Sequence, residues 1–409
     1  MMRVFWCVSL VLSLGIAYYI YIPLPETVGE PWKLMLLDAT IRSMFSVGSV
    51  VHALGLCHPI KFIRGSVKTL QNLSPVPSGG PKVHDTTFAG VDVRVYESSG
   101  VEQGKLKRGL IFLHGGGWAL GSNKERSYDL LCRKMSEELK AVVVSVEYRL
   151  VPDVYFPVQY EDCLVATTHF LRPEVLALYS VDPAHVGISG DSAGGNLAAA
   201  VAQQVAVDES ISVKLSAQAL IYPVLQGVDF NTPSYMQNEK VPILYRRGMI
   251  QFWLQYLKAD QSLVHQLLVN NHTAKDQEAV SKHRAKFDWT TLLSLEFHKK
   301  YKPVIPAKGT PNILEKLPAL LDVRASPLLA EDEVLRRTPR AFILTCEHDV
   351  LRDDGLMYAR RLQKVGVAVT SDLHADGFHG ILSFFQPPTS FESGQRAVKN
   401  LISWLNDNL

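Results

Sequence analysis

The sequence contains few cysteines, and none of them stands in a metal-binding pattern. Its five cysteines are scattered over 409 residues, and neither C-x-x-C nor H-E-x-x-H occurs. Zinc sites commonly use such spacings, and small secreted scaffolds are much denser in cysteine. We therefore expect neither a metal site nor a disulfide framework.

Clustered positive charge is also lacking. Lys and Arg number 42 against 40 Asp and Glu, which gives a formal net charge of +2, and no basic block stands out. A nucleic-acid-binding surface needs such a block, so nucleic acid is not an expected partner, and no obligate protein partner is evident either. Hydrophobic residues make up 47% of the chain, enough for one large α/β domain with an elaboration, or for two ordinary domains.

An uncharged apolar run stands near the start of the sequence, from Val4 to Ile22. Because a helix needs about 20 apolar residues to cross a bilayer, we predict that residues 4–22 form a signal-anchor transmembrane helix. A cleaved signal peptide is the alternative, but its apolar region would be shorter and small residues would follow it. Tyrosines end this run instead, as in the aromatic belt of a membrane interface.

The charges around this run predict its orientation. Arg3 precedes it, whereas Glu26 and Glu30 follow it. By the positive-inside rule, residues 1–3 form a short cytosolic N-terminus, and the rest of the chain lies across the membrane in a single-pass type II topology.

Residues 23–82 are expected to form membrane-proximal helices and a linker, and to be part of a cap. Between residues 34 and 60, apolar clusters are broken by charged residues, which indicates one or two amphipathic helices and not a second crossing. Residues 72–82 are rich in Pro, Gly and Ser and are typical of a linker.

Short apolar strands alternate with helices over residues 83–409. The predicted strands are Val91–Tyr96, Gly109–Leu113, Ala141–Val146, Val186–Ser189, Ala217–Tyr222, Ala341–Leu344 and Val367–Leu373. The predicted helices include Tyr128–Leu139, Gln159–Leu171, Asn196–Val205 and Asp354–Val365. This alternation predicts an α/β fold with a mostly parallel central sheet. Residues 226–318 interrupt the rhythm and are expected to form a helical cap over the carboxyl ends of the strands, where such sheets bind ligands.

A G-x-S-x-G motif occurs at residues 190–194, with Ser192 at its centre. The motif alone is weak evidence, but an apolar strand runs into it and a helix of small residues runs out of it. A nucleophile elbow requires this strand–turn–helix setting. Its glycines let strand and helix approach each other, so that the serine side chain projects above the sheet. We therefore predict that Ser192 is a catalytic nucleophile.

A second glycine-rich motif, H-G-G-G-W at residues 114–118, directly follows an apolar strand. Backbone N–H groups that approach a reacting oxygen explain these glycines better than a flexible turn does. A phosphate-binding loop is rejected, because serine and asparagine stand where that loop needs lysine. The expected oxyanion-hole residues are His114, Gly115, Gly116 and Ala193.

A serine nucleophile needs a histidine base, and the base needs an acid that orients it. In this class of fold the acid stands between serine and histidine along the chain. Asp349 follows a predicted strand and is the expected acid, whereas Asp353 and Asp354 fit better as the cap or first turn of the next helix.

The expected base is His379, which follows the last strand in a glycine-flanked loop. Two other histidines compete for this role. His348 lies beside the acid in sequence, and His374 is still at the edge of the strand, so we prefer His379.

These motifs make the sequence similar to the hormone-sensitive-lipase-like α/β-hydrolases, and within them to the neutral cholesterol ester hydrolase and arylacetamide deacetylase group. The likeness runs nearly from end to end. The segments that carry it include Tyr21–Pro25, Pro31–Thr40, His114–Leu120, Glu147–Pro152, Gly190–Asn196, Asp229–Tyr235, Asn270–Thr273, Leu344–Gly355 and Asp376–His379. The resemblance implies an α/β-hydrolase fold with the same triad and the same oxyanion-hole motif.

The sequence departs from this group at several positions. Ala119 replaces a cysteine that can pair in arylacetamide deacetylase with the counterpart of Cys346, so that disulfide is not expected here. Among the glycosylation sequons, Asn271 is the best candidate, and its use depends on a lumenal location. A second sequon at Asn72 is poor, because proline follows it.

Together these features predict a serine esterase or lipase in the endoplasmic reticulum membrane, with its catalytic domain in the lumen. Its expected substrates are carboxylic esters of lipids, and the resemblance suggests cholesteryl esters or acetylated ether glycerolipids. The reaction would pass through an acyl-enzyme and need no cofactor. Deacetylation of arylacetamides or other xenobiotics is the enzymatic alternative. The non-enzymatic alternative is a binding protein with a hydrolase fold, but such a protein tends to lose the serine or histidine that this chain retains.

Overall fold

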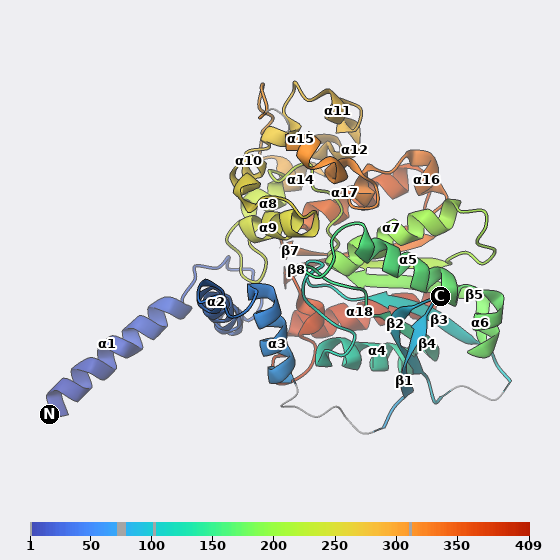
Figure 1. The fold of residues 1–409 in the computed structure, drawn as a ribbon, viewed down its shortest axis with the longest axis horizontal. Coiled ribbons are helices and arrows are strands. Elements are labelled where there is room, and N and C mark those ends of the chain that lie inside the picture. Colours follow the sequence, from blue (N-terminus) through green and yellow to red (C-terminus); the bar gives the residue numbers. More distant parts are fainter. Residues whose placement is uncertain (1, 72–78, 101–103, 311–312) are drawn as a thin grey trace.

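The structure is a computed structural model that describes residues 2–71, 79–100, 104–310 and 313–409. An eight-stranded sheet forms its centre, with the strands in the order β1-β2-β4-β3-β5-β6-β7-β8 (Figure 1). Their bounds are β1 Lys82–Phe88, β2 Val91–Glu97, β3 Lys107–Leu113, β4 Ala141–Val146, β5 Val181–Asp191, β6 Ala217–Ile221, β7 Arg340–His348 and β8 Val369–Phe378. The β1–β2 and β2–β4 pairs are antiparallel and the other neighbouring pairs are parallel, which confirms the predicted mostly parallel sheet.

All seven predicted strands are present, whereas β1 was not predicted. Among its residues only Phe88 is buried. An antiparallel strand at the edge of a sheet can face water, so it carries few of the apolar residues on which a prediction from sequence depends.

Helices cover both faces of the sheet, because successive residues of a strand point to opposite faces. On β3, Leu110 and Phe112 share a core with α4 and α18, whereas Ile111 and Leu113 share the other core with α5, α7 and α17. The bounds are α4 Arg126–Leu139, α5 Val158–Phe170, α6 Pro173–Leu178, α7 Ala193–Val207, α17 Arg352–Lys364 and α18 Glu392–Asn408. These layers form the predicted α/β-hydrolase fold.

A series of short helices lies between β6 and β7 and spans residues 226–318, the predicted cap insert. Its elements are α8 Pro233–Gln237, α9 Arg246–Tyr256, η1 Gln261–Leu263, α10 Val264–Leu268, η2 Asn271–Thr273, α11 Glu278–Ser281, α12 Arg284–Phe287, α13 Trp289–Leu292, α14 Leu295–His298, α15 Ile313–Lys316, η3 Pro318–Leu321, η4 Pro327–Leu329 and α16 Asp332–Arg336. The short helix η5, Ile381–Ser383, follows β8.

Three helices precede the sheet: α1 Met2–Ile20, α2 Pro31–Ala53 and α3 Pro59–Gln71. The apolar helix α1 projects away from the body (Figure 1). Within the described residues, α2 is the helix whose length and mean hydropathy of 1.4 would allow it to cross a membrane, whereas Phe5–Ile20 of α1 is a shorter apolar helix. However, Leu34, Asp38, Ala39 and Gly48 of α2 are buried, so α2 packs on the body of the protein. Most of the predicted linker, and the sequon at Asn72, lie outside the described residues.

Candidate active site

The nucleophile elbow is built where β5 ends and α7 begins. Ser192 stands between them with a φ of 55°, a backbone conformation that non-glycine residues rarely adopt. A Cβ atom on Gly190 would lie 2.4 Å from the Gly194 carbonyl oxygen, and one on Gly194 would lie 2.0 Å from the Leu113 carbonyl oxygen. The close approach of strand and helix therefore requires both glycines.

Ser192, His379 and Asp349 form a continuous hydrogen-bonded chain. His379 Nε2 lies 2.9 Å from Ser192 Oγ, and His379 Nδ1 lies 2.8 Å from Asp349 Oδ2. Since a carboxylate only accepts, Nδ1 carries the proton, and Nε2 accepts from the serine hydroxyl. The three side chains follow β5, β8 and β7, whose carboxyl ends meet at one edge of the sheet. The ring of Tyr222 packs edge-on against His379, with 4.9 Å between centroids.

The two neighbouring acids lie elsewhere, in the buried first turn of α17. Asp353 pairs with Arg352 and accepts from the backbone N–H of Ser234. Asp354 accepts from the N–H of Leu225. Burial raises the pKa of Asp354 to about 8. Both acids hold the start of the cap insert to α17.

The competing histidines also lie outside the chain of hydrogen bonds. His348 Nε2 is 2.9 Å from the Thr27 hydroxyl, and His374 pairs with Asp372. Burial lowers the pKa of His348.

The oxyanion loop differs from the expectation at Gly115. Its N–H donates to Asp191 Oδ1 at 2.8 Å and is also 3.0 Å from the Tyr128 hydroxyl, so it is not available to a substrate. The glycines of this loop that line the cavity beside Ser192 are Gly116 and Gly117. The sequence analysis did not name Gly117, although the third glycine of the motif was visible.

His114 supports the loop and does not line the cavity. Its buried ring stacks on Tyr148 with 4.3 Å between centroids, and its Nδ1 donates to the Gly115 carbonyl oxygen at 2.8 Å. The Tyr148 hydroxyl donates to the carbonyl oxygen of His114. Burial lowers the pKa of His114, so the ring is neutral and fixed in one tautomer.

Asp191 is a site residue that the sequence analysis did not single out, although it stands inside the elbow motif. Its buried carboxylate accepts from the Gly115 N–H and from the Tyr128 hydroxyl at 3.2 Å. Burial raises the pKa of Asp191 to about 6, and the bond from Gly115 opposes that rise. Asp191 thereby ties the oxyanion loop to the elbow.

A cavity of about 270 Å³ opens above Ser192. Its polar end contains Ser192, His379 and Asp191. Besides the glycine loop and Tyr128, the remaining walls are mostly apolar and come from four places. They are Ile41, Met44 and Phe45 of α2, Ile63 and Val67 of α3, Ile243, Leu244, Met249 and Phe252 in and before α9, and Phe384 after η5.

Two adjacent aromatic residues of α9 have different surroundings. Phe252 faces the cavity, and a Cβ atom on Gly117 would lie 2.5 Å from its ring. Trp253 is fully buried and packs against Trp118, with 5.0 Å between ring centroids. Among the described residues, no group of three His, Cys, Asp or Glu side chains is placed to hold a metal ion.

Comparison with known proteins agrees with this architecture. A family model described as the alpha/beta hydrolase fold matches residues 110–302 and 307–383. Neutral cholesterol ester hydrolase 1 of Bos taurus is 52% identical over 404 residues, covering 98% of this chain and 99% of that protein. Arylacetamide deacetylase of Bos taurus is 45% identical over 404 residues and 98% of both chains. An esterase structure from Pyrobaculum calidifontis has a TM-score of 0.62 and 26% identity, over 85% of this chain and 92% of that chain.

The chain belongs to the alpha/beta hydrolase family and is a hydrolase of the carboxylesterase type. Within that family it is a member of the group formed by neutral cholesterol ester hydrolase 1 and arylacetamide deacetylase.

Proposed function

We propose that Ser192, His379 and Asp349 are the catalytic triad of an enzyme that hydrolyses carboxylic esters of lipids. The observation that carries this proposal is the hydrogen-bonded chain of these three residues at the end of a largely apolar cavity. A polar reacting group inside apolar walls suits an ester bond within an otherwise hydrophobic molecule.

The reaction would proceed through an acyl-enzyme. His379 takes the proton of Ser192 as its oxygen attacks the ester carbonyl, and then returns that proton to the leaving alcohol. Asp349 holds the imidazole in the required tautomer and stabilises the imidazolium. Water, activated by the same histidine, then releases the acid and regenerates the serine.

The developing oxyanion would be bound by backbone N–H groups of Gly116, Gly117 and Ala193. Ala193 is the first residue of α7, where the N–H groups at the start of a helix favour negative charge. Each such donor contributes roughly 3–4 kcal/mol to transition-state stabilisation in serine hydrolases. The Gly115 N–H acts indirectly, because its bond to Asp191 fixes the loop.

Cholesteryl esters or acetylated ether glycerolipids are the proposed substrates. The 52% identity to neutral cholesterol ester hydrolase 1 supports the first of these, and the apolar α1 supports a substrate dissolved in a membrane. The 45% identity to arylacetamide deacetylase favours a second candidate, the hydrolysis of an arylacetamide.

The proposed organisation is that of a type II protein of the endoplasmic reticulum membrane. Residues 1–3 would be cytosolic, residues 4–22 would cross the bilayer, and residues 23–82 would be membrane-proximal and part of the cap. The catalytic domain, residues 83–409, would face the lumen, where Asn271 would carry a glycan. The amide of Asn271 is half-buried and lies 3.1 Å from the Thr310 hydroxyl.

The test is the variant Ser192→Ala, with Ser189→Ala as its matched control. Ser189 lies on β5, the strand that leads into the elbow, is buried, and its hydroxyl has no hydrogen-bond partner among the described residues. We expect S192A to lose roughly 10⁶-fold in kcat, as serine proteases do without their nucleophile, and to lose labelling by a fluorophosphonate. S189A should keep both. Turnover by S192A near that of the wild type would refute the assignment.

The substrate class requires a separate panel on the wild-type enzyme. A cholesteryl ester, an acetylated ether glycerolipid and an arylacetamide should be compared by kcat/KM. Preference for the arylacetamide would overturn the lipid assignment and leave the triad intact.

A further inference from the structure

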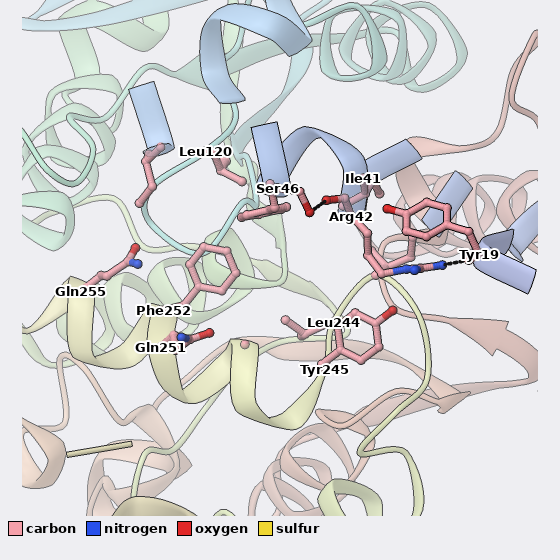
Figure 2. Close-up of a pocket in the computed structure, with 14 residues that line it drawn as sticks. Tyr19, Ile41, Arg42, Ser46, Leu120, Leu244, Tyr245, Gln251, Phe252 and Gln255 are labelled. Atoms are coloured by element: carbon pink, nitrogen blue, oxygen red, sulfur yellow. Dashed lines mark hydrogen bonds between the residues drawn. The ribbon is translucent and has the colours of Figure 1, made fainter. Parts of the chain in front are cut away.

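A second cavity, of about 410 Å³, is lined by residues of α2, α9 and the end of α1 (Figure 2). The two cavities share six lining side chains: Ile41, Phe45, Leu120, Ile243, Leu244 and Phe252. They are therefore neighbours. The second cavity also includes Tyr19, at the end of the apolar helix α1.

Polar contacts join the end of α1 to the rim of this second cavity. Arg42 of α2 donates to the Tyr19 carbonyl oxygen at 2.8 Å, and its guanidinium lies 4.6 Å from the centre of the Tyr19 ring (Figure 2). Arg42 also pairs with the buried Asp38, which accepts from the Tyr245 hydroxyl next to α9. These contacts fix the cavity at the level where α1 meets the body of the protein.

The outer face of α2 carries exposed apolar side chains, with the polar Ser43 among them, whose hydroxyl oxygen lies 3.1 Å from that of Tyr19. Trp32, Leu36, Val47, Val50 and the C-cap Leu54 are between 44% and 68% exposed. At 100° per residue, they fall within about 60° of one another around the helix axis. Ile41 and Phe45, which line both cavities, lie on the other side of the helix.

The charged residues of α2 do not interrupt this outer face. Lys33 pairs with Glu30, and Arg42 pairs with Asp38. An exposed apolar stripe on a helix that directly follows an apolar N-terminal helix is typical of contact with the bilayer interface. Figure 1 shows α2 between α1 and the body of the molecule.

We propose that α2 lies on the bilayer surface and that the second cavity is a lateral entrance through which a membrane-dissolved ester reaches Ser192. The occupant of the exposed face is the lipid bilayer, and the ligand of the cavity is a long-chain ester. This inference rests on the proposed function, because it gives the route by which the lipid substrate arrives.

Gly248 of α9 offers a sharp way to block this entrance. It lines the second cavity but not the cavity of Ser192, and a Cβ atom added there would meet nothing within 4 Å. Gly248→Trp would fill the open space, and Gly248→Ala is the matched control, because it makes the same backbone change with little added volume.

A third cavity, of about 500 Å³, also adjoins the central one and contains neither Tyr19 nor Gly248. Arg64 and Gln386 are among its polar lining residues. A water-soluble ester thus has a route that the Gly248 variants do not touch.

The experiment uses the full chain in phosphatidylcholine vesicles, with methylumbelliferyl oleate in the bilayer and methylumbelliferyl acetate in solution. The readout is the turnover rate on the oleate divided by the turnover rate on the acetate. For Gly248→Trp this ratio should fall about tenfold, equivalent to about 1.4 kcal/mol, and for Gly248→Ala it should stay near the wild-type value. An unchanged ratio in Gly248→Trp would overturn the entrance.

The surface contact is tested with Leu54→Asp, which places a charge on the outer face of α2. Its matched control is Leu178→Asp on α6, where the leucine is 75% exposed and remote from α1 (Figure 1). The ratio of oleate to acetate turnover should fall about tenfold for L54D and stay at the wild-type value for L178D. A charge at position 54 would have to enter the bilayer interface, which weakens interfacial binding. Equal effects of the two variants would overturn the contact.

A third measurement does not depend on hydrolysis. Brominated lipids should quench the fluorescence of the wild type more than that of Trp32→Phe, because Trp32 lies in the bilayer interface. Equal quenching would overturn the contact, and this is also the result expected if a second copy of the chain covered the face. If the wild type cleaves the acetate but not the oleate, the lipid-esterase function fails, while the quenching still decides where α2 lies.

Discussion

Phe252 and Trp253 are neighbours on one helix, and the structure gives them different roles. Both belong to the insert that the sequence predicts to lie over the ligand-binding edge of the sheet, where an aromatic residue can form either part of an acyl-binding wall or part of the core. Phe252 lines the cavity above Ser192, so the wall interpretation applies to it. Trp253 is 0% exposed and packs against Trp118, so the core interpretation applies there.

The expected effects of alanine at the two positions therefore differ in kind. Trp253→Ala leaves a void in a close-packed core and should lower the free energy of unfolding by about 3–5 kcal/mol. Phe252→Ala removes a ring that already borders open space, and should lower the free energy of unfolding by about 1 kcal/mol. It also enlarges the room above Gly117, so long acyl chains and short ones should be affected unequally.

The assay combines denaturant unfolding with kcat/KM for a series of esters from acetate to oleate. F252A should change the ratio of long-chain to short-chain kcat/KM, while W253A should lower stability and leave that ratio unchanged at a matched folded fraction. If W253A changes the chain-length ratio and F252A does not, the division of roles between the two residues is wrong.

Three further predictions concern the acids and the topology. Asp349→Asn should lower kcat by about 10⁴ through the wrong imidazole tautomer, whereas Asp353→Asn should act mainly through stability; equal kcat losses at matched folded fractions would contradict this. Burial raises the pKa of Asp354 from its ordinary value of 3.8 to about 8 in the folded chain, so its contribution to stability is fully present below pH 3.8 and is lost as the pH rises through 8. The free energy of unfolding should therefore decline less steeply between pH 4 and pH 8 in Asp354→Asn than in the wild type. An equal slope in the variant and the wild type would refute the raised pKa of Asp354. In sealed microsomes the catalytic domain should resist protease until detergent is added, and Asn271→Gln should abolish an endoglycosidase-induced band shift; digestion without detergent would reverse the proposed orientation.

The parallel strands and the hydrogen-bonded chain were predictable because their signals are local. The core strand β4, Ala141–Val146, is buried at every position and reads as an apolar run, and its predicted bounds match those observed. Ser192 stands between a strand and a helix that are both recognisable, and each of the other two chain members follows a strand end. The parallel topology then brings the three strand ends to one edge.

The walls of the cavity were less predictable, because they are assembled from distant segments. The sequence placed the helices near residues 34–60 beside the membrane and assigned them to a cap. It did not show that Ile41 of α2 and Val67 of α3 would face Ser192. The periodicity of a helix shows that it has an apolar face, but not which partner covers that face, and α2 has apolar residues on two sides.

The oxyanion loop shows most clearly where reasoning from sequence ends. Three consecutive glycines indicate that backbone N–H groups must approach something closely, but each glycine satisfies that pattern equally well. The choice among them depends on Asp191, a residue 76 positions further along the chain, which accepts the Gly115 N–H inside the protein. A buried carboxylate must be hydrogen-bonded, and this one uses the first glycine of the loop. The N–H groups left for a substrate follow from that single bond, so the two motifs have to be considered together in three dimensions.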